Sequence, residues 1–330
     1  MSNNVSQEVL DAFQDFQRAR VLFVQRVANL SRFPANVGLM QNAGILELLQ
    51  PLLDDNVTSI QQGASVTLGR LASKSEKVAQ AVVRNGLLGK VVKNLDGQNT
   101  SHKISAAYIL RAVAKHSPDL AADAVTAGAV DGLKACLEHI DPSVKEAACW
   151  ALDYISQHNG ELAKAVVDAE IVPLLVLAVQ EPEVTLKRIA VSCLGNLAKH
   201  SAALAQTVLA SKCLPHFGTL LDNYVEGRRD VVDNPLKRQI CACLAHIAKH
   251  SVKFAEEVVN ANLLPLIIEC GMFTCRVCSF VDPVPSDSAL MRFVLMFFLL
   301  LYFFPCECTL QRNPTRTNCL AKTRACCSRS

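Results

Sequence analysis

One short polar motif returns along the chain at a fixed interval, and this interval constrains the fold more than any other feature. The tetrad Ala-Lys-His-Ser occupies residues 114–117 and again 198–201, and Ser-Gln-His-Asn lies midway between them at 156–159. The repeat length is therefore 42 residues. Further copies are Ala-Ser-Lys-Ser at 72–75 and, after an insertion of eight residues, Ala-Lys-His-Ser at 248–251. A period of about 20 to 50 residues is typical of stacked repeat folds.

Each 42-residue unit divides into three predicted helices. In one copy, a short first helix at 162–170 is followed by an apolar second helix at 171–180. The third helix is seen most clearly at 144–158, in the preceding copy. Three apolar rows recur along the third helix: Ala64, Ala106, Ala148, Ala190 and Ile240; Leu68, Leu110, Leu152, Leu194 and Leu244; and Leu71, Val113, Ile155, Leu197 and Ile247. Spacings of four and three residues place these rows on one helix face. Because so small a unit cannot bury that face alone, we expect neighbouring units to stack into an all-α solenoid.

The composition indicates a large buried core and argues against two classes of function. Hydrophobic residues make up 51% of the chain and charged residues 19%. Residues 1–270 hold 26 basic and 27 acidic groups, which argues against a nucleic-acid-binding protein. The sequence has no phosphate-binding glycine loop, zinc-protease helix or nucleophile elbow. We therefore expect no enzymatic activity, cofactor or small-molecule substrate.

The cysteines and the first residues bear on cellular location. Six of the 14 cysteines are scattered through the first 269 residues. Isolated Cys at apolar helical positions usually behaves as a small buried hydrophobe in a reducing compartment. The amino-terminal residues lack a basic region followed by an apolar one, so no signal peptide is expected. These features favour the cytoplasm.

The repeat resembles the armadillo family. The period near 42, the three helices, a second helix that opens Ile-Val-Pro-Leu-Leu at 171–175 and a third helix at 186–201 carry the resemblance. It extends over about residues 20–270. It implies a right-handed superhelical solenoid with three helices per repeat. We expect an N-terminal helical cap at 1–33, followed at 34–270 by five full units and the start of a sixth.

Four segments narrow this resemblance to armadillo proteins of the central apparatus of motile cilia and flagella: 41–55, 108–121, 141–170 and 236–251. The resemblance implies a non-enzymatic cytoskeletal scaffold on the axonemal microtubule that contacts tubulin and other central-apparatus proteins and supports motility. Two alternatives stay open. One is a soluble armadillo adaptor in transport or signalling, and the other is a tail-anchored armadillo protein whose repeats face the cytosol.

Armadillo carriers of nuclear localisation peptides use a ladder of Trp and Asn on the third helix, which suggests where a partner groove would lie. The Trp-equivalent positions are Val66, Tyr108, Trp150, Ser192 and Ala242, and the Asn-equivalent positions are Arg70, Ala112, Tyr154, Asn196 and His246. Only Trp150 and Asn196 match, in different units, which argues against nuclear import. The candidate groove residues are Arg70, Trp150, Tyr154, Asn196 and His246. Trp150 also fits plain core packing.

A second row is basic. Lys103, Lys145, Lys187 and Lys237 share one register near the start of the third helix, and Arg188 and Arg238 adjoin two of them. A cation at a helix start opposes the helix dipole by about 0.3–1 kcal/mol, so local stability does not explain the row. It is either a solvated edge or a docking row for an acidic surface such as tubulin.

A third row consists of His116, His158, His200 and His250, with Lys74 in the same register. Neighbouring copies lie a whole repeat apart, so we do not expect two of them to share a metal ion. A His at a helix C-terminus can donate to the last carbonyls and suits the dipole there. The row therefore predicts helix capping and no metal site.

After Cys270 the repeat pattern stops. Residues 271–330 are Cys-rich and hydrophobic, and we expect them to be disordered or an aberrant product of splicing, frameshift or read-through. The apolar run 293–304 would be about 18 Å long as a helix. This is too short for a hydrocarbon core of about 30 Å, so no membrane contact is expected unless the tail anchors the chain. The pairs Cys275/Cys278 and Cys306/Cys308 are a weak zinc signal.

Overall fold

The described part of the chain is helical throughout. A computed structural model describes residues 2–97, 99–225, 234–263 and 265–266, and it has no strand within them. All of these residues belong to the first of two compact units, Met1–Pro283. The second unit, Val284–Ser330, lies outside the described residues, as do the whole of the predicted tail at 271–330 and residues 226–233 of the insertion.

A long helix, α1 (Ser2–Leu30), precedes successive three-helix units. The first helices are α2 (Asn36–Asn42), α5 (Glu76–Arg84), α8 (Pro118–Thr126), α11 (Gly160–Asp168), α14 (Ala202–Ala210) and α17 (Val252–Asn260). The second helices are α3 (Ile45–Leu49) with the 3-10 helix η1 (Gln50–Asp54), α6 (Leu87–Asp96), α9 (Ala129–Leu137), α12 (Ile171–Ala178) and α15 (Cys213–Val225). The third helices are α4 (Thr58–Lys74), α7 (Thr100–Ala114), α10 (Pro142–Ser156), α13 (Val184–Ala198) and α16 (Asn234–Ala248).

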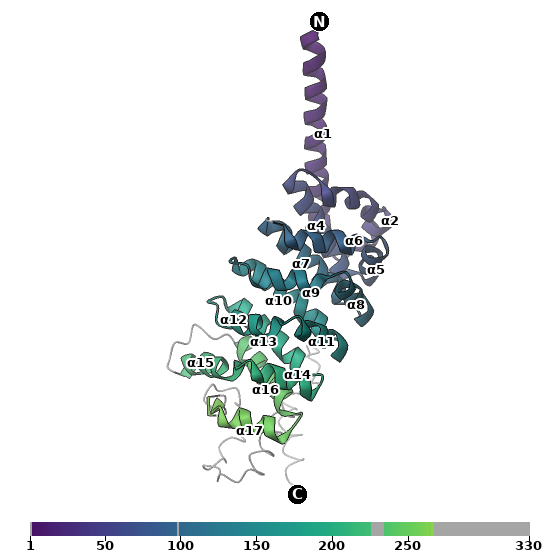
Figure 1. Ribbon diagram of the computed structural model, residues 1–330. Helices are drawn as coiled ribbons and strands as arrows, with labels where there is room; N and C mark the ends of the chain where they lie inside the picture. Colours follow the sequence, from purple (N-terminus) through teal and green to yellow (C-terminus); the bar gives the residue numbers. More distant parts are fainter. Residues whose placement is uncertain (1, 98, 226–233, 264, 267–330) are drawn as a thin grey trace, which may run out of the picture. The chain divides into compact units, whose positions relative to one another are not determined.

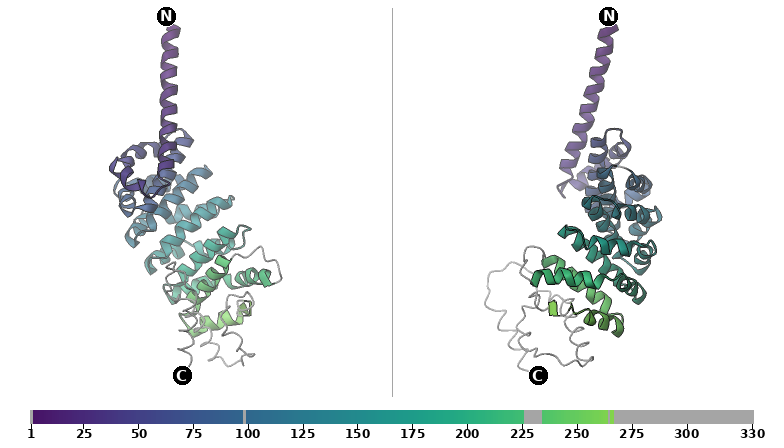
Figure 2. Two further views of the ribbon diagram at one scale, coloured as in Figure 1. Left: turned by 180° about the vertical axis from the view of Figure 1, so that it is seen from behind. Right: turned by 60° about the vertical axis from the view of Figure 1, so that its left-hand side comes forward.

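The third helices pack on one another in chain order, α4 on α7, α7 on α10, α10 on α13 and α13 on α16 (Figures 1 and 2). All three predicted apolar rows are buried in this stack, with exposed fractions of 0–3%. The small first row lets the helices approach closely, and Gly195 on α13 lies against the backbone of Cys243 on α16. The predicted three-helix unit and its core face are confirmed.

The last residue of each tetrad starts the next unit. Ser117, Asn159, Ser201 and Ser251 are the N-cap residues of α8, α11, α14 and α17. Each side-chain oxygen accepts a hydrogen bond from the backbone N–H three residues on, at 2.8–3.3 Å. An N-cap satisfies one of the amide groups that a helix start leaves unpaired. The tetrad therefore fixes where one unit ends and the next begins.

The short turn between each first helix and the second contains one residue with left-handed backbone. It is Gly44, Gly86 or Gly128 in the early units and Glu170, Lys212 or Asn262 in the later ones, with φ between 56° and 86°. One such residue ends a helix and reverses the chain. Because this conformation costs a non-glycine residue about 1–2 kcal/mol, the later units form the same turn at greater cost.

All six cysteines of the described repeats are free and buried, as expected. Burial raises the pKa of the Cys213 thiol to about 12 and raises the pKa of Cys149, Cys193 and Cys243 as well. Thiols held in the neutral form are poor nucleophiles and poor metal ligands. These cysteines therefore serve as core packing groups.

Candidate functional site

One face of the stacked third helices remains partly open to solvent and contains the predicted groove positions. Val66, Tyr108, Trp150, Ser192 and Ala242 are half-buried, and so are Arg70, Tyr154, Asn196 and His246 four residues later. Only Ala112 in this series is buried. Because the helices lie side by side, these positions form one row across α4, α7, α10, α13 and α16 (Figure 1). We call this row the third-helix face.

An aromatic pair occupies the middle of the third-helix face. The rings of Trp150 and Tyr154 on α10 stack with their centroids 6.3 Å apart and their planes 21° from parallel. The guanidinium of Arg111, on the neighbouring α7, lies over both rings, 4.0 Å from the Trp150 centroid and 5.5 Å from that of Tyr154. Such a contact is worth about 0.5–2 kcal/mol, and it holds both rings in place.

Arg111 was not among the predicted site residues. Arg111 immediately precedes Ala112 of the groove register. The equivalent residues in three other units are Gly69, Gly195 and Ala245. A charged residue at a position that is small in three other units was the available signal. The role of Arg111 depends on its contact with Trp150 in the next unit. That contact forms only when the units are stacked.

Asp153 precedes Tyr154 on α10, at the position equivalent to Arg111. Its side chain is buried, and its Oδ1 accepts a hydrogen bond of 2.9 Å from Nδ2 of Asn196 on α13. Burial raises the pKa of this carboxyl to about 6, against the lowering effects of hydrogen bonds from Ser192 and Asn196 and of the Arg111 charge. Removing a carboxylate from water favours its neutral form. The face thus contains an acid whose charge responds to modest changes of pH.

The two ends of the third-helix face differ from its centre. At one end, Nη1 of Arg70 donates a hydrogen bond of 3.0 Å to the carbonyl oxygen of Ala28 in α1. At the other end, burial and the nearby Lys249 and Lys199 lower the pKa of His246 to about 4. His246 is therefore neutral near pH 7. The predicted groove residues all lie on this face, with Arg70 engaged by α1.

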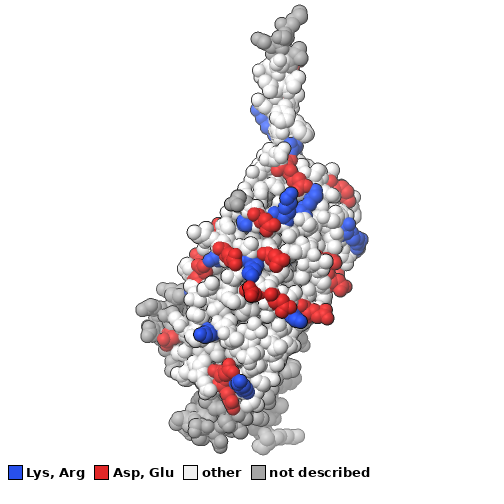
Figure 3. Space-filling model, viewed as in Figure 1, with Lys and Arg blue, Asp and Glu red and all other residues white. Residues whose placement is uncertain are grey.

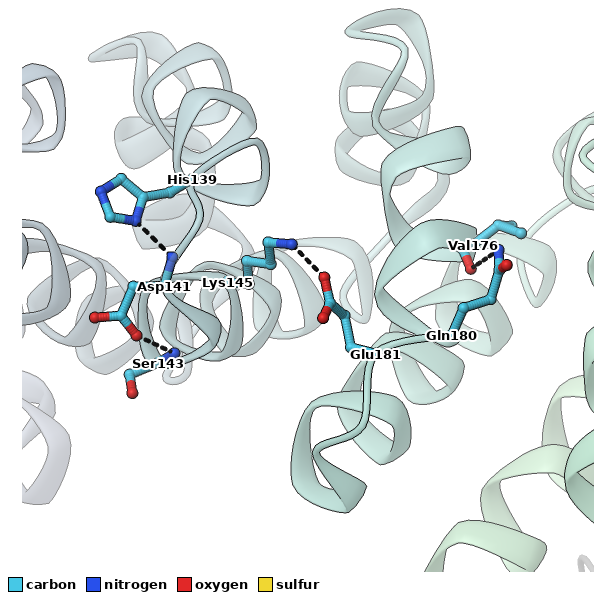
Figure 4. A network of polar contacts seen from close by, with 7 residues as sticks. All are labelled: His139, Asp141, Ser143, Lys145, Val176, Gln180 and Glu181. Carbon is cyan, nitrogen blue, oxygen red and sulfur yellow. Dashed lines mark hydrogen bonds and ion pairs between the residues drawn. The ribbon is translucent and has the colours of Figure 1, made fainter.

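The basic residues do not form the exposed row that either sequence interpretation assumed. Lys103 is buried and its Nζ donates to the Leu95 carbonyl oxygen at the end of α6, and Lys237 is completely buried on α16. Lys145 is half-buried and forms an ion pair with Glu181 of the following unit (Figure 4). The third helices α7, α10 and α13 each pack against the second helix of their own unit.

Besides the ion-paired Lys145, three of the predicted basic residues remain at least partly accessible. Lys187 and Arg188 on α13 are half-buried and Arg238 on α16 is exposed. On the face of the molecule shown in Figure 3, lysine and arginine are interspersed with aspartate and glutamate. A basic surface at the start of the third helices is thus limited to α13 and α16.

The histidine row caps helices, as predicted, but those of the preceding unit. Each Nε2 donates to a carbonyl oxygen in the last turn of the third helix one unit earlier: His116 to Ala72 (2.6 Å), His158 to Ala114 (2.6 Å), His200 to Ser156 (2.7 Å) and His250 to Ala198 (2.8 Å). The lysine before the histidine does the same in two units, Lys115 to Ser73 and Lys199 to Gln157. Lys74 donates to Ser31 and Arg32 at the end of α1. The tetrad side chains therefore connect each unit to the preceding unit by hydrogen bonds.

This capping leads to an expected result. His158→Ala should lower the free energy of unfolding by about 1–2 kcal/mol, because the Ala114 carbonyl loses its donor at a unit boundary. Urea unfolding followed by circular dichroism would measure this loss. His216→Ala, at a half-buried histidine of α15 outside the capping row, is the control and should cost less. Equal stability of His158→Ala and the wild type would show that water replaces the cap without loss.

Two structural absences complete the site. Among the residues that the structure describes, no group of three or more His, Cys, Asp or Glu side chains is placed to hold a metal ion. Within the same residues, no helix is both long and apolar enough to cross a bilayer. The apolar run 293–304 and the cysteine pairs of the tail lie outside the described residues.

Comparisons with known proteins agree with this geometry. The Armadillo/beta-catenin-like repeat family matches residues 117–157. Sperm-associated antigen 6 of Mus musculus and that of Homo sapiens are each 49% identical to the chain over 88 residues, which is 27% of this chain. The chain spans 17% of the length of these curated relatives.

Solved structures resemble the fold over most of the chain. A crystal structure of an engineered protein has a TM-score of 0.65 at 24% identity and covers 77% of this chain and 98% of its own. A designed armadillo repeat protein in complex with the peptide (KR)4 has a TM-score of 0.63 at 19% identity, with 76% and 98% covered. The predicted all-α armadillo-repeat solenoid is confirmed, and so is the similarity to sperm-associated antigen 6. Armadillo repeats indicate a scaffold for protein interaction.

Proposed function

We propose that this armadillo-repeat solenoid is a non-enzymatic scaffold of the axonemal central apparatus, which binds proteins along its third-helix face and supports ciliary or flagellar motility. The observation that carries the proposal is the ordered aromatic pair Trp150 and Tyr154, which Arg111 contacts on the half-buried third-helix face. Aromatic side chains with restricted motion lose little entropy on binding and are common binding hot spots.

The chemistry of the third-helix face suits an extended polypeptide. Trp150 and Tyr154 offer apolar contact, while Ser192 and Asn196 of the next unit offer polar groups a short way along the same row. A bound strand would run across several helices, so that each unit contributes a small contact. A compact substrate would instead require groups that converge on one pocket, as in enzyme sites.

The accessible basic residues support a second contact. Lys187, Arg188 and Arg238 lie near the starts of α13 and α16, and the buried Lys103 and Lys237 take no part. A cluster of accessible cations favours an acidic partner by charge complementarity. Within the proposed scaffold, these three residues would contact the acidic surface of axonemal tubulin.

The axonemal part of the proposal is supported by the similarity to sperm-associated antigen 6. That similarity reaches 49% identity but covers 27% of the chain, whereas the fold resemblance to the two solved structures covers 76–77% of it. A soluble adaptor in transport or signalling would use the same third-helix face without the axoneme. The cellular location of the protein would therefore distinguish an axonemal scaffold from a soluble adaptor.

The test follows a fluorescent fusion of the full chain in a flagellated cell. We expect wild-type protein on axonemes after detergent extraction, and at least about tenfold less of the Trp150→Leu/Tyr154→Leu variant, because leucine keeps apolar packing but removes the ring contacts. Lys187→Glu/Arg188→Glu/Arg238→Glu should be reduced as well if these residues contact tubulin.

Two matched controls keep the result interpretable. Phe33→Leu removes an aromatic ring that is 62% exposed and lies outside the third-helix face. Lys77→Glu/Arg84→Glu/Lys164→Glu makes the same change of charge on exposed residues of the first helices. Normal axonemal binding of the Trp150/Tyr154 variant would overturn the role of the third-helix face. Diffuse wild-type protein would overturn the axonemal scaffold and favour the soluble adaptor.

A further inference from the structure

Basic side chains gather where two neighbouring third helices, α13 and α16, end. Lys199 and His200 follow the last residue of α13, and Lys249 and His250 follow the last residue of α16. His246 lies in the last turn of α16. Because α13 and α16 pack on each other, equivalent residues at their ends belong to one part of the surface. We call these five residues the cation cluster.

Hydrogen bonds hold the cation cluster together across the unit boundary. Nε2 of His250 donates a bond of 2.8 Å to the carbonyl oxygen of Ala198, the residue immediately before Lys199. The His250 ring therefore lies at the end of α13. Nζ of Lys199 donates in turn to the carbonyl oxygen of Gln157, at 2.9 Å. The basic groups of two units are thus fixed beside one another by the same contacts that stack the units.

The charges of the cation cluster act on one another. Burial, followed by the charges of Lys249, Lys199, His250 and His200, lowers the pKa of His246 to about 4. Burial and the charge of Lys199 lower the pKa of Lys249. Burial and both lysines also lower the pKa of His200, against the effect of its backbone hydrogen bond. Since nearby like charges disfavour the charged form of a group, a bound anion would relieve this repulsion.

The lysine charges of the cation cluster are not neutralised within the part of the chain that the structure describes. Neither Lys199 nor Lys249 forms an ion pair there. The charge of Lys199 acts on the carboxyl of Asp153, but that carboxyl is buried and accepts a hydrogen bond from Asn196. Lys249 is exposed and Lys199 is half-buried. A partner can therefore reach both lysines from solvent.

The cation cluster adjoins the third-helix face. Lys199 follows Asn196 by three residues, and Lys249 follows His246 by three. Residues three apart lie on the same side of a helix, so both lysines continue the row that Asn196 and His246 belong to. The equivalent residue in the unit before Lys199 is Gln157, which is uncharged. The positive charge is therefore confined to one boundary, whereas a nucleic-acid backbone needs a long basic track.

We propose that the cation cluster binds acidic side chains of a polypeptide that lies along the third-helix face. This inference rests on the proposed function of that face and specifies the chemistry of the partner. The bound segment would place an apolar or aromatic residue at Trp150 and Tyr154, and glutamate or aspartate at Lys199 and Lys249. The contact is separate from the basic residues near the starts of α13 and α16, which lie at the other ends of these helices.

Fluorescence anisotropy with the full chain and a labelled peptide tests the inference. The probe is a short peptide in which glutamate alternates with serine, and the comparison peptide has glutamine in place of glutamate. At about 0.15 M salt, wild-type protein should bind the glutamate peptide at least about tenfold more tightly than the glutamine peptide. Lys249→Glu should raise the dissociation constant of the glutamate peptide by about tenfold, and Lys249→Arg, which keeps the charge, should not.

Lys77→Glu is the matched control, because it makes the same change of charge at an exposed residue of α5. It should bind the glutamate peptide as the wild type does. Equal affinity of the wild type for the two peptides would overturn the inference, as would binding that is unaffected by Lys249→Glu. A short single-stranded DNA of thymidines that binds more tightly than the glutamate peptide, and loses affinity in Lys249→Glu, would assign the cation cluster to phosphates instead.

The peptide assay and the axonemal fusion fail separately. Peptide binding that depends on Lys249, together with diffuse wild-type fusion protein, would support the acidic-segment site and reject the axonemal role. Normal axonemal binding of the fusion, together with peptide binding that ignores Lys249→Glu, would reject the acidic-segment site alone.

Discussion

Gly195→Val is expected to lower the free energy of unfolding by about 3 kcal/mol or more, because no space exists for a side chain between α13 and α16. A Cβ atom at this position would lie 3.2 Å from Cα and 3.4 Å from Cβ of Cys243. Cα of Cys243 is backbone, so relief requires α16 to move away as a whole. Urea unfolding at constant pH would measure the loss.

Gly89→Val is the matched control for this prediction. Gly89 also lies within a helix, α6, but nothing is within 4 Å of the position of its missing Cβ. Valine has a higher helix propensity than glycine, so this variant should be as stable as the wild type or slightly more so. Equal effects of the two substitutions would mean that helix propensity, and not the spacing of α13 and α16, governs the result at Gly195.

Asp153→Asn is expected to stabilise the protein above about pH 6 and to have little effect near pH 4. The pKa of Asp153 is raised from 3.8 to about 6 by burial, so the folded state binds its proton more tightly than the unfolded chain does. The stability from this group is present below pH 3.8 and is lost as the pH rises through about 6. By pH 8 the loss is on the order of 2–3 kcal/mol.

Asparagine has nearly the same shape as aspartate and can still accept the hydrogen bond from Asn196, but it carries no charge to desolvate. The free energies of unfolding of the variant and the wild type should therefore diverge between pH 4 and pH 8. Asp131→Asn, at an exposed residue of α9, is the control and should stay within about 0.5 kcal/mol of the wild type at both pH values. A loss of stability in Asp153→Asn at pH 8 would mean that the Arg111 charge outweighs the desolvation of Asp153.

His246 changes the absolute stability in the opposite direction over a similar range. Its pKa is lowered from 6.5 to about 4, so its contribution is present above pH 6.5 and is lost as the pH falls through about 4. The pH profile of the wild type alone would mix the two effects. For this reason the difference between variant and wild type at each pH is the quantity that reports on Asp153.

Much of the fold followed from local patterns that every unit repeats. The apolar rows of the third helix predicted its buried face, because a helix in a stack has one direction in which to bury side chains. The polar tetrad predicted a helix end with capping histidines. That the donor acts on the preceding unit was not predicted, since the sequence does not tell which carbonyl lies beside His158 once the units are stacked.

The candidate site was less predictable, since its chemistry arises between units. The groove register placed Trp150 and Tyr154 correctly on the partly open third-helix face. Arg111 was not predicted, because its partners Trp150 and Tyr154 are about 40 residues away in the sequence. The register also treated Lys103 and Lys237 as surface groups, although the packing of the helices around them buries their stems.

The tetrad bonds have a consequence for how the chain unfolds. Each of them joins a unit only to the one before it, and none links distant units. The free energy of the array is then close to a sum of nearest-neighbour terms, as in a one-dimensional Ising chain. Damage at a single boundary would divide the array into two blocks that melt separately. The cooperativity of unfolding is therefore limited by the least stable boundary between two units.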